Sequence, residues 1–212
     1  MVEKGKEGAA QALEAAAADI EFSRGRFVIA GTDRSIGILE LAQKMPGTLD
    51  VSHATQPIPS AFPNGCHAVE VEVDPETGVI DVVRHSSVND FGTVVNPLLV
   101  EGQIHGGLVQ GIGQALMEHT VYDESGQLLT GSFMDYAMPR APDVPFFGAE
   151  SHPVPATTNP LGTKGCGEAG CAGALVSVMN AVVDALRPLG INHIDMPATP
   201  ARVWEAIRQA KA

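Results

Sequence analysis

Alternating apolar and acidic residues predict an antiparallel strand pair in the middle of the chain. In HAVEVEVD (67–74), valine and acidic residues alternate with the period of a strand that buries one face. The following PETG supplies a turn, and VIDVV (79–83) returns as the partner strand. A shorter hairpin is predicted over 20–31, around the tight turn at Arg24-Gly25.

Other segments have the composition or the period of helices. Residues 3–18 are rich in Ala, Glu, Lys and Gln, which are strong helix formers. From 96 to 117 apolar residues recur at helical spacing after a favourable Asn-Pro start, and 174–186 is strongly apolar. Thr199-Pro200 opens the last helix. A short helix through Ile38–Leu41 is expected to be capped by Asp33 or Ser35.

The remaining segments predict short strands and long connections. Proline-rich stretches at 50–64 and 138–160 predict extended loops, and we expect short strands at 127–130 and 191–194. Because we find no repeat and no linker, we treat 1–212 as one unit. The sum is an α+β fold, with a mixed or antiparallel sheet packed against helices.

Composition and charge exclude several classes of protein. The 212 residues are 44% hydrophobic, which is enough for a substantial core, and the net charge of −12 makes nucleic acid an improbable partner. We expect no transmembrane segment, because no run approaches about 20 unbroken apolar residues. The three cysteines do not form a disulfide framework, so we expect a reducing, cytoplasmic compartment.

A glycine-rich loop before the helix at 174 is the first candidate for chemistry. In GTKGCGEAG (162–170), glycines on both sides of Glu168 let the backbone approach a ligand closely. The helix start that follows favours an anion. The alternative is a simple helix-entry turn with an exposed glutamate. The loop is not a Walker motif, because Lys164 is not followed by Ser or Thr.

The second candidate is the glutamine- and glycine-rich segment 101–114. Its glutamine amides offer donors and acceptors to a heterocyclic cofactor, and its four glycines predict close backbone approach on one face. The alternative is a tightly packed helix pair with its glutamines in solvent. The seven histidines follow no HExxH or HxH pattern, so we expect no metal held by protein side chains.

Several long segments together resemble one family. They are VNDFGTVVNPLLVEGQIHGGLVQGIGQAL (88–116), NPLGTKGCGEAGCAGALVSVMNAVVDAL (159–186) and DMPATPARVWEAI (195–207). They look like the C-terminal end of the large, molybdenum-binding subunit of the xanthine dehydrogenase, aldehyde oxidase and aerobic carbon monoxide dehydrogenase family. The last segment is most similar to the carbon monoxide dehydrogenase branch. The resemblance covers essentially the whole chain.

The resemblance implies a molybdopterin cofactor with molybdenum, often as the cytosine dinucleotide in bacterial members. It also implies hydroxylation with water as the oxygen source, in which the glutamate of this loop acts as general base; here that residue is Glu168. The cofactor contacts that carry over lie in three segments: Gln103, Gly106 and Gly107; Asp90; and Lys164, Gly165, Cys166 and Gly167.

Family large subunits are several times longer than this chain, so the resemblance implies part of an enzyme. We expect the cofactor only in the complete enzyme, with the remaining molybdopterin-binding segment or subunit as partner. Iron–sulfur and flavin subunits are implied by the resemblance alone. Two readings of another class stay open: a non-catalytic module that binds a small anion or nucleotide, and an assembly or scaffold domain.

Overall fold

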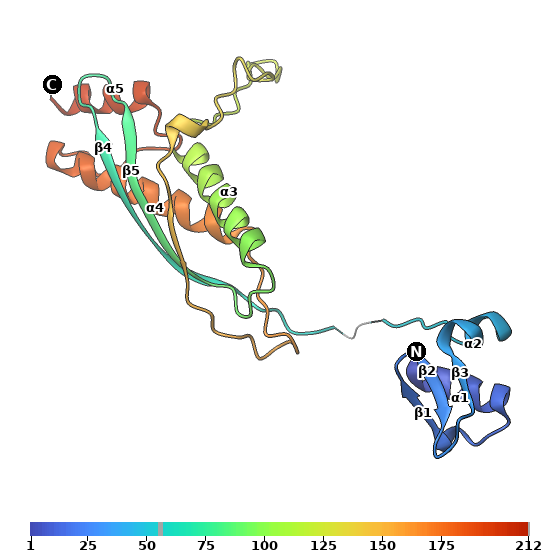
Figure 1. The fold of residues 1–212 in the computed structure, drawn as a ribbon. Helices are drawn as coiled ribbons and strands as arrows, with labels where there is room; N and C mark the ends of the chain where they lie inside the picture. Colours follow the sequence, from blue (N-terminus) through green and yellow to red (C-terminus); the bar gives the residue numbers. More distant parts are fainter. Residues whose placement is uncertain (55–56, 212) are drawn as a thin grey trace. The chain divides into compact units, whose positions relative to one another are not determined.

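The computed structural model describes residues 1–54 and 57–211, and the chain folds as two compact units, Met1–Pro57 and Ile58–Ala212 (Figure 1). Each unit has a hydrophobic core of its own. The sequence indicated a single unit over 1–212, since the polar and proline-rich stretch near residue 57 was not recognised as a boundary. That both units serve one cofactor-binding domain stays a prediction.

Unit 1 is a small three-stranded sheet covered by helices. Its antiparallel strands follow the order β1-β2-β3, and Phe27 and Leu41 are fully buried in its core. Its elements are α1 (Val2–Leu13), β1 (Ile20–Ser23), β2 (Arg26–Ile29), β3 (Ser35–Gly37) and α2 (Ile38–Lys44), with a 3-10 turn at Ala17–Asp19.

Two details of unit 1 differ from the sequence predictions. The first helix was expected to end near Asp19, but it ends at Leu13, because Glu14 takes a left-handed conformation with φ of 53° that ends the helix. Ser35 does not cap α2; it lies in β3, and Gly37 is the N-cap residue. The predicted hairpin over 20–31 is confirmed.

Unit 2 is built on a long twisted strand pair. β4 (Asn64–Val73) and β5 (Ile80–Asp90) pair antiparallel, as the alternating valines predicted, and both extend further than expected. A third strand, β6 (Gly148–Ser151), lies parallel to β5 and completes the order β4-β5-β6. The prolines of 138–160 predict a loop there, so this strand was not expected.

Three helices complete unit 2: α3 (Pro97–Leu116), α4 (Ala169–Leu186) and α5 (Pro200–Ala210). α4 contacts β4, and α3 packs on α4 (Figure 1). α4 begins at Ala169, five residues before the predicted start. By length and composition alone, 169–189 would also suffice to cross a membrane, but α4 here contributes Val178 and Val182 to the core.

Two predicted short strands do not form. Residues 127–130 make only an isolated bridge, between Tyr122 and Leu128, and 191–194 are irregular. Ile191 and Ile194 are nevertheless buried, so their apolar character reflects core packing and not strand pairing. The α+β class is confirmed.

Candidate functional site

The glycine-rich loop is fastened to the end of β5 by backbone hydrogen bonds. Thr93 N donates to Gly162 O at 2.9 Å, and Lys164 N donates to Phe91 O at 2.9 Å. Gly92 and Gly162 both have positive φ, and a Cβ on Gly92 would lie 2.1 Å from Gly162 O. Glycine is therefore required where the two backbones meet.

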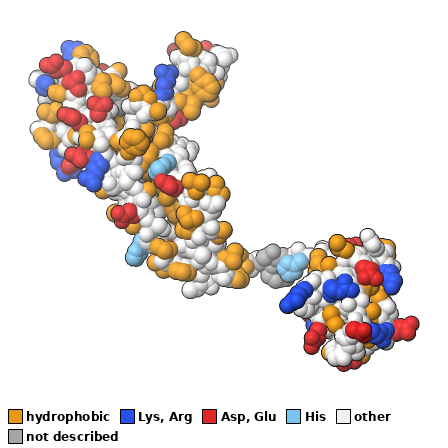
Figure 2. Space-filling model, viewed as in Figure 1, with side chains coloured by type: hydrophobic (Ala, Val, Ile, Leu, Met, Phe, Trp, Pro, Cys, Tyr) orange, Lys and Arg blue, Asp and Glu red, His pale blue; other side chains and the backbone are white. Residues whose placement is uncertain are grey.

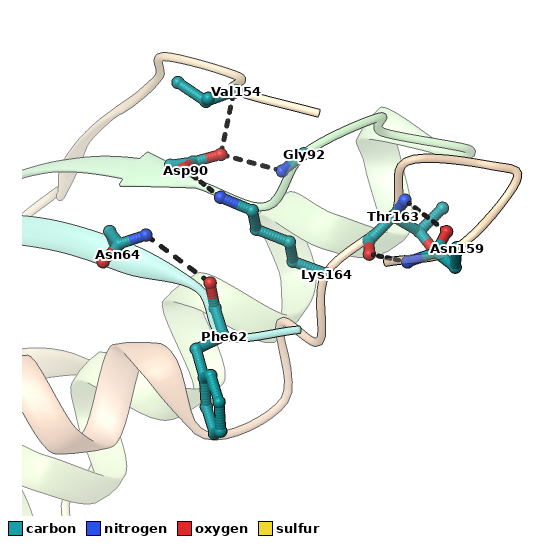
Figure 3. Close-up of polar contacts among 8 residues, drawn as sticks. All are labelled: Phe62, Asn64, Asp90, Gly92, Val154, Asn159, Thr163 and Lys164. Carbon is teal, nitrogen blue, oxygen red and sulfur yellow. Dashed lines mark hydrogen bonds and ion pairs between the residues drawn. The ribbon is translucent and has the colours of Figure 1, made fainter. Parts of the chain in front are cut away.

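The loop also closes on itself through one asparagine. Asn159 Nδ2 donates to Thr163 O at 2.9 Å, and its Oδ1 accepts from Thr163 N at 3.1 Å (Figure 3). These two hydrogen bonds hold 159–163 in one turn conformation. The turn therefore sets the direction of the residues that follow it. Asn159 is not among the residues that the sequence motifs predicted for the site.

A buried ion pair joins the two predicted segments. Lys164 Nζ lies 2.5 Å from Asp90 Oδ2, and the two side chains are only 9% and 12% exposed (Figure 3). Asp90 Oδ1 accepts hydrogen bonds from Gly92 N and Val154 N, each at 2.9 Å. Both carboxylate oxygens are thus engaged within the chain, and Asp90 acts as a fastening point for three segments.

Asp90 is held as an anion. The hydrogen bond from Lys164, followed by those from the Val154 and Gly92 amides, holds the pKa of its carboxyl well below the usual range. Lys164 in turn points its charge at Asp90 and not toward open space. Asp90 and Lys164 therefore hold the glycine-rich loop in position.

Glycines allow α3 and α4 to pack backbone to backbone. A Cβ on Gly107 would lie 2.9 Å from Cys171 N and 3.0 Å from Gly170 Cα, and one on Gly111 would lie 2.7 Å from the Ala174 side chain. The predicted residue Gly107 thus faces the helix contact. This packing fixes the start of α4 against the middle of α3.

The helix contact brings the two candidate segments together. A Cβ on Gly167 would lie 3.9 Å from Gln103 Oε1, so the glutamine on α3 adjoins the loop before α4. Cys166 packs against a small core cluster that includes Ile104 and Leu108. Gly106 and Gly165 face open space, since an added Cβ at either would meet no atom of the described chain within 4 Å.

Glu168 is the N-cap residue of α4. Its side chain is exposed and makes no capping hydrogen bond, while its carbonyl accepts from Ala172 N at 3.0 Å. The carboxylate is therefore free to act on a bound group beside the amides that begin the helix. A cavity of about 820 Å³ lies elsewhere, between β4, the second half of α4 and residues 192–196.

A buried polar cluster beneath the start of α4 was not predicted. His67 Nδ1 lies 3.2 Å from His85 Nε2, and Asn89 Nδ2 donates to Ser87 Oγ at 3.0 Å. Burial, and then the charge of His67, lowers the pKa of His85 to about 4. A cavity of about 310 Å³ is lined by His67, Asn89 and the first turns of α4. Lone histidines in a sequence carry no signal for such pairing.

Comparison with known proteins finds similarity over nearly the whole chain. The family model of the molybdopterin cofactor-binding domain matches residues 1–145, which include α3 but not the loop at 162–170. The chain is 38% identical over 213 residues to the nicotine 6-hydroxylase large subunit of Paenarthrobacter nicotinovorans, covering 94% of this chain and 26% of that subunit.

Two solved structures have the same fold. Carbon monoxide dehydrogenase from Oligotropha carboxidovorans matches with a TM-score of 0.74 and 32% identity, over 98% of this chain and 27% of its own. Quinoline 2-oxidoreductase from Pseudomonas putida 86 matches with a TM-score of 0.72 and 37% identity, over 98% and 28%. The chain therefore spans about a quarter of the length of the relatives it matches.

Proposed function

Because this chain belongs to the molybdopterin cofactor-binding domain family, we propose that unit 2 supplies one wall of a molybdopterin–molybdenum site, with Glu168 as its general base. The observation that carries this proposal is the meeting of Gln103 on α3 with the loop that ends at Glu168. The Glu168 carboxylate is exposed and makes no capping hydrogen bond, and it lies beside the free amides of the first turn of α4. This arrangement suits general acid–base catalysis on a bound group.

The chemistry of these residues fits one side of such a cofactor. Gly106 and Gly165 leave space beside the backbone, so a flat ligand can approach closely there. The Gln103 amide offers a donor and an acceptor to a heterocycle, and the amides at the start of α4 favour an anionic group. Gly107 contributes indirectly, by holding α3 against α4.

The molybdenum–pterin group supplies two-electron redox chemistry when bound. Within this chain, the Glu168 carboxylate accepts a proton from the water-derived nucleophile, and Gln103 orients a polar edge of the cofactor. The Asp90–Lys164 ion pair holds the loop in place, which keeps Gly165 and Gly167 against the ligand. Cys166 anchors the same loop by packing on the core of α3.

The finer parts of the proposal come from the family resemblance of the sequence motifs. We assign the cytosine dinucleotide form of the cofactor, hydroxylation with water as oxygen source, and a reducing cytoplasmic compartment. The partners are the remaining part of a molybdopterin-binding subunit, together with iron–sulfur and flavin subunits. One wall leaves most polar edges of a large anionic pterin in water, so the isolated chain will hold little or no molybdenum.

Elemental analysis tests the proposal. The chain is purified alone and after co-expression with the part of the nicotine 6-hydroxylase large subunit that it does not cover, in a host that makes the cofactor. We expect molybdenum only in the co-expressed sample. Stoichiometric molybdenum in the isolated chain, or none in a well-formed complex, would contradict the proposed wall.

A matched pair of variants tests the base. Glu168→Gln keeps size and polarity but cannot accept the proton, so turnover should fall by about 10²–10⁴-fold while molybdenum content stays unchanged. Glu124→Gln, on an exposed turn, is the control and should leave both unchanged. Equal turnover in the two variants would remove Glu168 from the mechanism and favour an assembly role.

A further inference from the structure

The first turns of α3 carry a glycine that nothing in the described part of the chain explains. Gly102 lies inside a helix, where glycine costs about 1 kcal/mol relative to alanine. Its φ is not left-handed, and an added Cβ would meet no atom of the described chain within 4 Å. Neither the backbone conformation nor the packing of this chain therefore requires glycine at 102.

Large apolar side chains that precede this glycine in the sequence are exposed. Val95, Leu98 and Leu99 are 79%, 75% and 66% exposed. The spacing of Leu98, Leu99 and Gly102 places them on one side of the helix. Figure 2 shows hydrophobic side chains gathered at the end of unit 2 where α3 begins. Val95, Leu98, Leu99 and Gly102 together form what we name the α3 N-terminal face.

We propose that this face binds the part of a large subunit that corresponds to the unmatched three quarters of the relatives. The main chain of that part would pack directly over Gly102. The inference rests on the proposed function, because it names the partner that completes the same site. Clustered, exposed apolar residues mark an interaction surface, and the missing Cβ admits a main chain.

The extent of the relatives identifies the occupant. The chain covers 26% of the nicotine 6-hydroxylase large subunit and 28% of the quinoline 2-oxidoreductase chain, so in both relatives about three quarters of the polypeptide lies outside the match. Gln103 follows Gly102 directly and adjoins the loop of Glu168. Polypeptide that covers the α3 N-terminal face therefore continues the wall of the proposed site.

Binding measurements with variants of this face test the inference. The probe is the part of the nicotine 6-hydroxylase large subunit that the chain does not cover, expressed as a separate polypeptide and titrated calorimetrically into the full chain. Gly102→Ala and Leu98→Ser should each raise the Kd by about tenfold or more. Glu101→Ala, on the neighbouring residue but another side of α3, is the matched control and should leave Kd unchanged.

The stability of each isolated variant separates binding from folding. Gly102→Ala should unfold at the same or a higher temperature than the unmodified chain, because it improves helix propensity without a clash. Weaker binding together with undiminished stability would support the proposal.

Three results would overturn it: no complex with the unmodified chain, equal Kd values for Gly102→Ala and Glu101→Ala, or a self-associated dimer that Gly102→Ala disrupts. Molybdenum analysis of the complex is read separately. A complex that forms through this face but binds no molybdenum would refute the proposed function and leave the docking surface intact.

Discussion

Two neighbouring glycines of α3 should respond in opposite ways to the same substitution. Gly107→Ala adds a methyl group 2.9 Å from Cys171 N and 3.0 Å from Gly170 Cα, and neither backbone atom can rotate away. Gly106→Ala adds the same group where no atom of the described chain lies within 4 Å. Both substitutions gain the same helix propensity, so the difference between them isolates the helix–helix contact.

The magnitudes follow from these contacts. Alanine in place of a helical glycine stabilises by up to about 1 kcal/mol. Overpacking a tight contact costs about 1–3 kcal/mol, and a backbone obstacle places Gly107→Ala at the upper end. We expect Gly106→Ala to raise the free energy of unfolding by up to about 1 kcal/mol, and Gly107→Ala to lower it by about 2 kcal/mol.

Urea unfolding of the isolated chain measures both variants. Trp204 is the only tryptophan and lies on α5, so its fluorescence reports on unit 2. The predicted difference corresponds to midpoint shifts of opposite sign, and in thermal unfolding to about 2–4 °C per kcal/mol. If Gly107→Ala were as stable as Gly106→Ala, the close α3–α4 contact, and with it the placement of Gln103 beside Gly167, would be wrong.

Three further outcomes are expected. The pKa of His85 is lowered to about 4 by burial and then by the charge of His67. The free energy of unfolding should therefore be highest above pH about 6.5 and fall by up to about 3 kcal/mol as the pH drops toward 4, because the unfolded state then binds a proton that the folded state does not. In urea titrations, His85→Gln should reduce this dependence on pH. Lys164→Gln removes the largest cause of the lowered pKa of Asp90, so acid unfolding should begin at higher pH than in the unmodified chain, as monitored by circular dichroism. Gly173→Ala places a Cβ 2.4 Å from the His67 ring and should lower the melting temperature, whereas Ala172→Gly, at an exposed neighbouring position, should cost only about 1 kcal/mol.

Local sequence patterns predicted those helices and strands that are determined by residues close together in the sequence. The strand pair of β4 and β5 follows from alternating valines, and α3 from Asn96, whose side chain accepts a hydrogen bond from Leu99 N as an N-cap. The family, the α+β class and the partial extent of the chain were also predicted correctly from the ordered motifs.

Features that depend on distant partners were not predictable. β6 exists because β5 offers it a free edge, and GAES has no strand pattern of its own. The Asp90–Lys164 ion pair joins residues 74 positions apart, and the sequence around either residue does not indicate its partner. That Asp90 lies near a cofactor stays a prediction, and the sequence did not indicate that its carboxylate accepts hydrogen bonds from Lys164 and two backbone amides.

The structure supports the helix-pair reading of the glutamine–glycine segment on one side of α3, and the cofactor reading stays a prediction. Gly107 and Gly111 are explained by the contact with α4, which is the helix-pair reading. Gly102 and Gly106 find no such explanation within the described chain, although each costs α3 stability. Since glycine is kept where a neighbour must come close, the unexplained pair indicates which side of α3 faces a partner. Gln103 adjoins Gly167, in the loop before α4, so polypeptide packed over Gly102 and Gly106 would border the proposed cofactor site rather than share its face of the helix.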